Sequence, residues 1–233
     1  MLPTTRSPNA LSGLRWLNRP DYLVNRLRVY LWEKSHPDDP WIADEMVRIL
    51  DEWLRAEDVG IEFGSGRSTP WLASRISHLV SIEHDSYWWT LVHNALSNAN
   101  LSSKVDLRLI EFDPRQWKET PEHSPYVNSV NDVPDNSVDF VLVDGWARSY
   151  CALVGMQKLK PGGILVFDDI HSHYPLTAKR LRRPRLPPLI RTEPHPPHFA
   201  NVIRALRHWR CIWVGNGKQD TALWVKPHSF KQT

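Results

Sequence analysis

The sequence predicts an α/β protein whose doubly wound, mostly parallel sheet ends in a C-terminal antiparallel hairpin. Two patterns carry this prediction. From Val59 onward, short apolar runs alternate with segments of helix length, as expected when helices join parallel strands and cover both faces of the sheet. The final segment, residues 210–227, instead has two strand-like runs around a turn that contains Gly-Asn-Gly, which predicts an antiparallel pair.

The strands are expected where β-type apolar runs are bounded by polar or turn residues. The first 58 residues are mostly helical by pattern, and we interpret residues 1–40 as an N-terminal helical cap on a domain that spans 41–233. Helices are expected over 21–34 and 44–57. The predicted parallel strands are 59–63, 78–83, 105–111, 138–144 and 162–168.

The helices between these strands have recognisable ends. Thr69 is expected to cap the helix after the first strand, with Pro70 at its first position. Asp85 is expected to cap the next helix, which begins at Ser86. A helix over 150–159 should end in the turn Leu-Lys-Pro-Gly-Gly at 159–163.

Length and composition set the limits on function. A chain of 233 residues with a net charge of +3 can bury one sizeable core and has no overall field that calls for nucleic acid or a membrane. No run approaches the roughly 20 apolar residues of a membrane helix, and no secretory-type segment opens the chain. We therefore expect a cytoplasmic protein without a membrane partner, in which Cys151 and Cys211 are buried free thiols and not a disulfide.

The stretch VGIEFGSGRSTPWL, residues 59–72, indicates a cofactor site. Gly64 and Gly66 follow the first strand, at the end of a doubly wound sheet where ligands bind. A dinucleotide fingerprint would have a third glycine where Thr69 stands, and Glu62 would repel a pyrophosphate. The pattern therefore disfavours a nicotinamide dehydrogenase and favours a cofactor that carries an ammonium group and no phosphate.

The segment EFGSGRST resembles the first motif of the class I S-adenosylmethionine-dependent methyltransferases, over roughly residues 41–226. That family has a seven-stranded sheet with the last strand antiparallel, in agreement with the predicted hairpin. The resemblance implies S-adenosylmethionine as cofactor. It also implies that Glu62 and the backbone of Gly64, Ser65 and Gly66 face its methionine end.

The same resemblance assigns residues to the nucleoside. Glu83 closes the second strand, where the family places the acid that accepts hydrogen bonds from the ribose hydroxyls, and its spacing from Gly64 suits that role. His84 would flank the adenine. Glu111 and Asp113, after the third strand, are both candidates for the acid that meets the adenine amine.

Three carboxylates are expected to converge at the reaction end, because Asp144 ends the fourth strand and Asp168 and Asp169 end the neighbouring fifth. The three could hold Mg²⁺, as in catechol-type and caffeoyl-CoA-type O-methyltransferases. The sequence departs from those enzymes, since it has Asp-Asp where they have Asp-Asn and Gly-Trp after Asp144. Asp144 is also counted among the cofactor contacts, and Arg148 is expected to form a structural pair with it.

A metal-free reaction is the alternative. Asp144, Asp169, His171 or His173 could accept a proton from a hydroxyl or an amine as the methyl group arrives.

Residues 171–198 form a basic, proline-rich insert after the fifth strand. Either the insert recruits an anionic acceptor to the site below it, or it is a solvated loop. The chain lacks an N/D-P-P-Y/F motif after the fourth strand, which argues against methylation of base amines in DNA.

The sequence thus predicts methyl transfer from S-adenosylmethionine to an oxygen, with nitrogen as second choice, of a small-molecule acceptor. Two alternatives stay open: an RNA-directed methyltransferase that uses the basic insert, and a non-catalytic cofactor-binding or partner-binding module.

Overall fold

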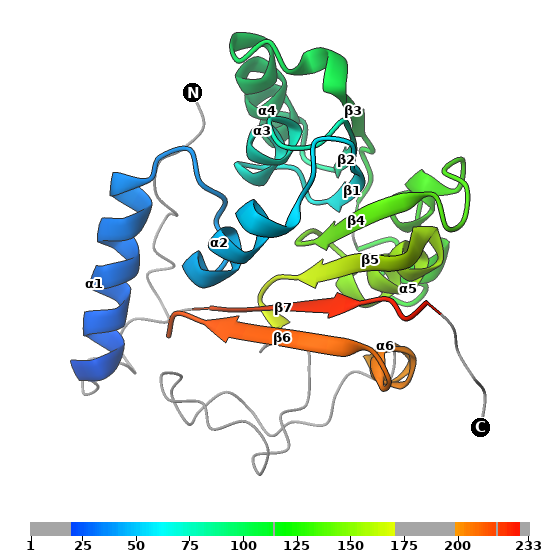
Figure 1. Cartoon of the computed structure of the whole chain (residues 1–233). Coiled ribbons are helices and arrows are strands. Elements are labelled where there is room, and N and C mark those ends of the chain that lie inside the picture. The colour runs from blue at the N-terminus through cyan, green and yellow to red at the C-terminus, as the bar shows by residue number, and fades with distance from the viewer. Residues whose placement is uncertain (1–19, 114, 171–198, 218, 229–233) are drawn as a thin grey trace.

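Seven strands form one sheet in the order β3-β2-β1-β4-β5-β7-β6 (Figure 1). The computed structural model describes residues 20–113, 115–170, 199–217 and 219–228. Neighbours from β3 to β5 are parallel, whereas β7 is antiparallel to both β5 and β6. This confirms the predicted doubly wound sheet with its antiparallel hairpin. The strands are β1 (Val59–Phe63), β2 (His78–Glu83), β3 (Val105–Leu109), β4 (Val138–Val143), β5 (Leu159–Phe167), β6 (Arg210–Gly215) and β7 (Asp220–Val225).

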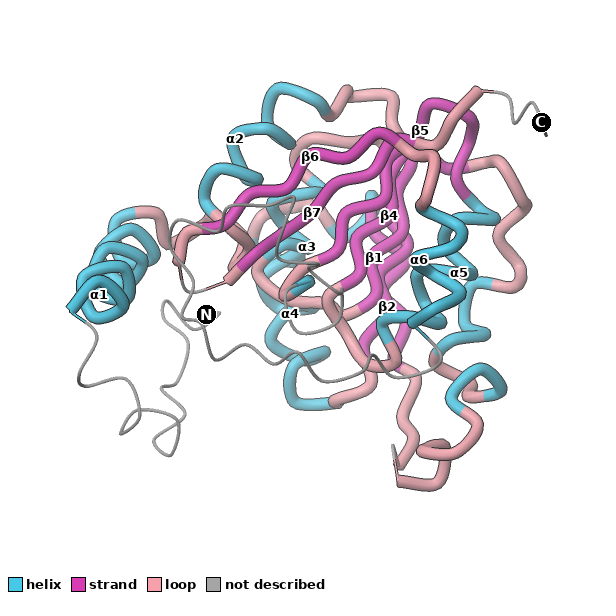
Figure 2. The backbone as a smooth tube through the Cα atoms, turned by 90° about the horizontal axis from the view of Figure 1, so that it is seen from below, coloured by secondary structure: helices cyan, strands magenta, loops and turns pink. Residues whose placement is uncertain are grey.

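Helices cover both faces of the sheet (Figure 2). One face carries α2, α3 and α4, and the other carries α5 and α6. The α-helices are α1 (Pro20–Ser35), α2 (Asp44–Trp53), α3 (Ser68–Ala73), α4 (Ser86–Asn98), α5 (Arg148–Lys158) and α6 (Phe199–Leu206). Three short 3-10 helices are η1 (Ser102–Lys104), η2 (Pro121–His123) and η3 (Val127–Val130).

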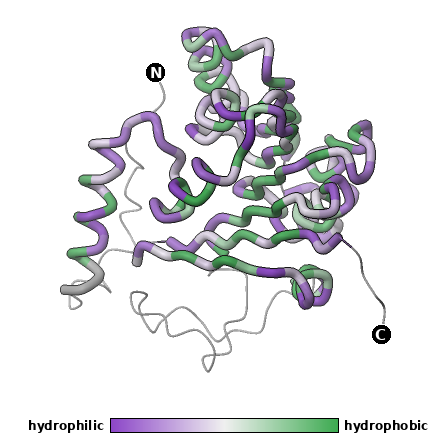
Figure 3. The backbone as a smooth tube through the Cα atoms, in the orientation of Figure 1, coloured by the Kyte–Doolittle hydropathy of each residue, from purple (hydrophilic) through white to green (hydrophobic). Residues whose placement is uncertain are grey.

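The core is divided by the sheet, because successive side chains of a strand point to opposite faces. In β1, Ile61 and Phe63 pack on the face that carries α5 and α6. Gly60 and Glu62 point to the other face, where a Cβ added at Gly60 would lie 3.0 Å from the Phe140 side chain. Hydrophobic residues accordingly gather along the central strands (Figure 3).

Helix α1 packs on the side of α2 and the hairpin. Val29 on α1 is buried, Trp32 packs against the core cluster that includes α2, and Arg28 donates to Asp44 at 3.2 Å. The outer side of α1 keeps several apolar side chains exposed. Within the described residues, no helix is long and apolar enough to cross a bilayer.

The helix boundary at Thr69 differs from the prediction. Helix α3 begins at Ser68, so Thr69 lies inside the helix and does not cap it. Its hydroxyl donates to Glu62 Oε2 at 2.6 Å and accepts the N–H of Gly66 at 2.9 Å. The side chain is therefore bound to the turn that precedes the helix. The predicted cap at Asp85 is confirmed, since its Oδ1 accepts the N–H groups of the first turn of α4.

Three further expectations needed correction. Residues 159–163 are not a turn but the beginning of β5, where a register shift between Val138 and Phe140 keeps the strand paired with β4. Strands β3 and β4 end at Leu109 and Val143, earlier than expected. Both cysteines are free, but Cys211 is exposed, because it lies on the edge strand β6.

Candidate functional site

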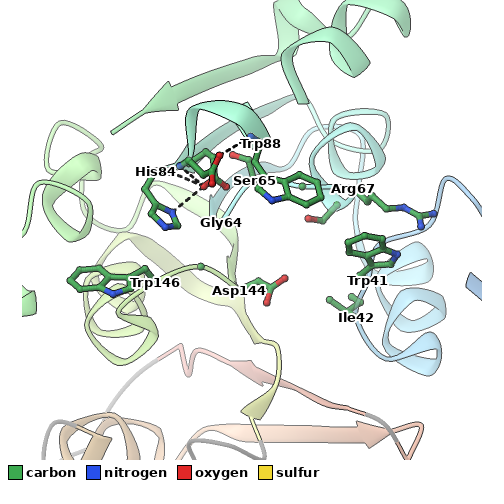
Figure 4. A pocket seen from close by; sticks show the side chains of 14 residues that line it. Trp41, Ile42, Gly64, Ser65, Arg67, His84, Trp88, Asp144 and Trp146 are labelled. Atoms are coloured by element: carbon green, nitrogen blue, oxygen red, sulfur yellow. Dashed lines mark hydrogen bonds and ion pairs between the residues drawn. The ribbon is translucent and has the colours of Figure 1, made fainter. Parts of the chain in front are cut away.

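A cavity of about 480 Å³ opens at the carboxyl ends of β1, β2 and β4 (Figure 4). The chain runs from β1 outward to β3 and then returns to place β4 on the other side of β1, so the cavity lies where the strand order reverses. It is lined by Trp41, Ile42, Gly64, Ser65, Gly66, Arg67, Ser68, Glu83, His84, Asp85, Trp88, Asp144, Gly145 and Trp146.

The glycine turn after β1 forms the base of this cavity. Gly64 has a φ of 98°, and a Cβ there would lie 2.6 Å from the backbone nitrogen of Gly145. Only glycine therefore allows the turns after β1 and β4 to approach this closely. The N–H groups of Gly64 and Ser65 both donate to the carbonyl of Ile82, at 2.9 and 3.2 Å. These bonds fix the turn against the end of β2.

Glu62 lies behind the turn, outside the cavity lining. Its side chain is fully buried and accepts hydrogen bonds from the hydroxyls of Ser68, Thr69 and Ser81. The direct contact with the methionine end that the sequence predicted therefore has no support in this geometry. Instead Glu62 joins the first turn of α3 to β2. Burial raises the pKa of Glu62 to about 7, although the three hydroxyls oppose the rise.

Glu83 presents one carboxylate oxygen to the cavity. It is 5% exposed, and its Oε1 accepts the N–H groups of His84 at 2.7 Å and Asp85 at 2.9 Å. Within the described chain, Oε2 has no hydrogen-bond partner. Glu83 thus combines a fixed orientation with a free acceptor. Its Oε1 also lies 3.0 Å from His84 Nδ1, and the carboxylate raises the pKa of His84 above its ordinary value.

An aromatic group flanks one side of the cavity. The rings of His84 and Phe112 have centroids 5.5 Å apart, and those of Phe112 and Trp146 are 4.9 Å apart. Tyr126, which is fully buried, packs against all three. His84 and Trp146 line the cavity itself, and their position suits a flat heteroaromatic group.

The opposite wall comes from the segment between α1 and α2. Trp41 and Ile42 line the cavity, and the Arg67 guanidinium lies 5.3 Å from the Trp41 ring centroid. Arg67 also donates to the carbonyls of His36 and Pro37. The glycine turn and the N-terminal segment are therefore joined by one buried side chain.

The sequence did not single out the tryptophans of the lining. Trp88 lies on the first turn of α4, three residues after the capping Asp85, and Trp146 comes two residues after Asp144. Trp88 lies five residues after the strand-end acid Glu83 and Trp146 two residues after Asp144, and this proximity is the signal that could have identified them. No local pattern marks Trp41, because it reaches the site only when its segment packs against residues that are distant in the sequence.

The predicted convergence of acids is confirmed in position. One carboxylate oxygen each from Asp144, Asp168 and Asp169 lies within 4.8 Å of the others. Asp144 lines the cavity, Asp168 is fully buried, and Asp169 has a left-handed backbone with a φ of 50°. Of the three, only Asp144 is part of the cavity lining.

The acid cluster suits a metal ion poorly. The Arg148 guanidinium lies among the carboxylates, with Nη2 at 2.8 Å from Asp144 Oδ1, as expected for the predicted structural pair. Oδ1 of Asp168 already accepts the Thr221 hydroxyl at 2.5 Å. A divalent ion would have to share these oxygens with a resident positive charge. The residues present therefore do not fit the predicted Mg²⁺ site.

The remaining predicted residues lie elsewhere. Asp113 does not line the cavity, and its carboxylate is paired with Arg115 at 3.0 Å, because the chain turns back immediately after β3. Glu111 is exposed and is also outside the lining. His171 and the whole basic insert, 171–198, lie outside the described residues.

Comparison with known proteins identifies relatives by structure and not by sequence. No family model matches the chain, and no curated protein matches its sequence. Among solved structures, a methyltransferase-like protein from Silicibacter pomeroyi is 19% identical, with 83% of this chain and 91% of that chain covered and a TM-score of 0.53.

Two other solved structures share the fold but differ in their assigned acceptor. A protein assigned as an O-methyltransferase from Klebsiella pneumoniae is 16% identical, covers 90% of this chain and 91% of its own, and has a TM-score of 0.50. A protein assigned as an rRNA methylase from Clostridium thermocellum is 12% identical, covers 77% and 92%, and has a TM-score of 0.51. The described chain therefore has the fold of the class I S-adenosylmethionine-dependent methyltransferases.

Proposed function

We propose that this protein is an S-adenosylmethionine-dependent methyltransferase that acts on an oxygen of a small molecule. The observation that carries the proposal is the free Oε2 of Glu83, held at the edge of a cavity whose base is the glycine turn. A carboxylate oxygen fixed in this way can accept hydrogen bonds from vicinal ribose hydroxyls.

The rest of the cavity is consistent with this cofactor. His84 and Trp146 offer aromatic surfaces to an adenine. Asp85, Glu83 and Asp144 give the lining an excess of carboxylates over the single guanidinium of Arg67. That balance favours a ligand that carries ammonium and sulfonium charges and disfavours a pyrophosphate. When bound, the cofactor would supply an electrophilic methyl group on sulfur.

The chain's own contribution to transfer would be positioning and proton acceptance. Asp144 lies at the cavity wall beside Gly145, so its carboxylate can accept a hydrogen bond from the hydroxyl of the methyl acceptor. It could then take the hydroxyl proton as the bond between oxygen and the methyl carbon forms and the bond between that carbon and sulfur breaks. Asp169 and His171 are further candidates for the group that accepts the proton.

We also propose that the protein is cytoplasmic and that its domain begins at residue 41, after an N-terminal cap over 1–40.

We prefer a small-molecule acceptor to RNA because the described wall of the cavity is acidic. Recognition of RNA would depend instead on the basic insert, residues 171–198. If the insert binds RNA, binding should weaken steeply with salt and be lost when Arg182, Arg183 and Arg185 become alanine. If the acceptor is instead an anionic small molecule, the same alanine substitutions should raise the Michaelis constant for that acceptor.

The proposal is tested by calorimetric titration with S-adenosylmethionine and S-adenosylhomocysteine of the native protein, Glu83→Gln and Asp85→Asn. In Glu83→Gln the amide oxygen can still accept the two backbone N–H groups that Oε1 accepts, so the NH₂ group faces the cavity and cannot accept from ribose. We expect binding to weaken by about 10- to 100-fold.

Asp85→Asn is the matched control. It removes the same single charge from the same cavity wall while its oxygen keeps the cap on α4, so we expect affinity to change little. Equal losses in both variants would indicate a general charge effect and not a ribose contact. Absence of binding by the folded native protein would overturn the proposal, and binding of NADH would favour the dehydrogenase alternative.

A further inference from the structure

Arg148 lies inside the cluster formed by Asp144, Asp168 and Asp169. It is the first residue of α5, and its side chain is 17% exposed. The neighbouring Ala147 has a left-handed backbone with a φ of 48°, which starts the helix directly beneath the acids. The three acids come from the turns after two adjacent strands, β4 and β5.

The guanidinium is bound on every side. Nη2 lies 2.8 Å from Asp144 Oδ1 and donates to the Asp144 carbonyl at 2.7 Å. Nε donates to the carbonyl of Gly145 at 3.1 Å, and Nη1 donates to the carbonyl of Asp168 at 2.5 Å. Nη1 also lies 4.0 Å from Asp169 Oδ2. One planar cation therefore connects the turn after β4 with the turn after β5.

We propose that Arg148 is the resident cation of this acid cluster and takes the place that a divalent metal would otherwise fill. A hard cation needs carboxylate oxygens at about 2.0–2.6 Å, including Asp144 Oδ1, which Arg148 already holds. A second cation at that distance would be repelled by the guanidinium. Arg148 is thus a positioning residue that orients Asp144 toward the cavity.

This inference narrows the acceptor class, and that part of it rests on the proposed function. Without a metal, the cluster cannot chelate two adjacent hydroxyls of one acceptor. The site then selects acceptors by a single hydroxyl or amine that hydrogen-bonds to Asp144. Methyl transfer would therefore be insensitive to chelators and would not require a catechol-like diol.

The test is a titration of the full-length protein with Mn²⁺, in which binding is measured by calorimetry and by the relaxation rate of water protons. We expect the native protein and Arg148→Lys to show no saturable binding below about 10 mM, because both keep a positive charge among the acids. Arg148→Met keeps the length of the side chain without its charge. It should gain a Mn²⁺ site with a dissociation constant of about 0.1–1 mM, and the added change Asp144→Asn should remove it.

Two results would overturn the proposal. One is saturable Mn²⁺ binding by the native protein that Asp144→Asn abolishes. The other is a folded Arg148→Met that binds Mn²⁺ no better than the native protein does. If circular dichroism shows Arg148→Met to be unfolded, Arg148→Gln replaces it, since its amide can still donate to a backbone carbonyl. None of these readouts uses methyl transfer, so failure of the proposed function would show in the cofactor titration alone.

Discussion

Glu62 and Glu83 show how two glutamates near strand ends take different roles according to their distance from the carboxyl edge of the sheet, since Glu62 is level with Ser81 and Glu83 lies two residues further along β2. Glu62 is fully buried under α3, where three hydroxyls surround it. Glu83 is the last residue of β2 and reaches the cavity, with one oxygen bound by backbone N–H groups. We therefore assign Glu62 to support of the glycine turn and Glu83 to ligand recognition.

The burial of Glu62 predicts a specific pH dependence of stability. Its pKa is raised from 4.5 to about 7 in the native state. Between these values the native protein holds a proton that the unfolded chain has released, so this group stabilises less as the pH rises through that window. Relative to Glu62→Gln, we expect the free energy of unfolding of the native protein to fall by about 3 kcal/mol between pH 4.5 and 7.

Denaturant unfolding of both proteins at intervals from pH 4.5 to 8 measures this difference. The difference should change across the window and become constant above it. A constant difference at every pH would show that Glu62 stays ionised despite its burial.

The two glycines of the turn should respond differently to alanine. Gly64→Ala places a Cβ 2.6 Å from the Gly145 nitrogen at a φ of 98°, so we expect a loss of more than about 2 kcal/mol of stability. A Cβ at Gly66 meets no heavy atom within 4 Å, so Gly66→Ala should change stability by less than about 1 kcal/mol. Thermal unfolding of both variants compares them, and equal losses would show that the turn rearranges.

At the scale of elements, strand β7 joins the N-terminal segment to the acid cluster. The Thr221 hydroxyl on β7 accepts the N–H of Ala43 at 3.0 Å and donates to Asp168 Oδ1 at 2.5 Å. Ala43 directly follows the cavity residues Trp41 and Ile42. The antiparallel hairpin therefore holds one wall of the cavity as well as completing the sheet.

Replacement of the Thr221 hydroxyl tests this connection. Thr221→Val keeps the shape but leaves a buried N–H without its partner and removes one partner of a buried carboxylate. We expect a loss of about 2–3 kcal/mol in the free energy of unfolding, together with weaker cofactor binding. Thr221→Ser keeps the hydroxyl and should lose less than about 1 kcal/mol. Calorimetric unfolding and cofactor titration of both variants give the comparison, and similar losses would contradict the role of the hydroxyl.

At the scale of the whole molecule, the N-terminal helices and the sheet share one core. Helix α2 contributes Met46, Val47 and Leu50 to the same buried cluster as Leu142 and Val166 of the central strands. Trp32 of α1 packs against that cluster. Helix α1, which lies in the predicted cap, therefore packs on the core of the sheet, whereas the wall residues Trp41 and Ile42 are the first residues of the predicted domain.

This shared core predicts one cooperative unfolding transition for the native protein. Far-ultraviolet circular dichroism and tryptophan fluorescence should give coincident denaturation curves, because loss of α2 exposes the face of the sheet. An earlier loss of helical signal, with fluorescence unchanged, would show instead that the N-terminal helices unfold as a separate unit.

The sequence by itself determined most of the strands and their order along the chain. Apolar runs located β1 and β2 to the residue, the Gly-containing turn located the hairpin, and Asp85 marked the start of α4. It also brought Asp144, Asp168 and Asp169 to one edge, since carboxyl ends of adjacent parallel strands meet there. These features depend on local pattern and on topology, which a sequence carries directly.

Only the tertiary structure decided which side chains form the cavity and what each contacts. The partners of Glu62, the position of Trp41 on the wall and the contacts of Arg148 with Asp168 and Asp169 all depend on contacts between different elements. The structure also places Asp113 outside the cavity lining, where its carboxylate pairs with Arg115. Such contacts are set by how helices and turns pack on the sheet, and no local pattern encodes them.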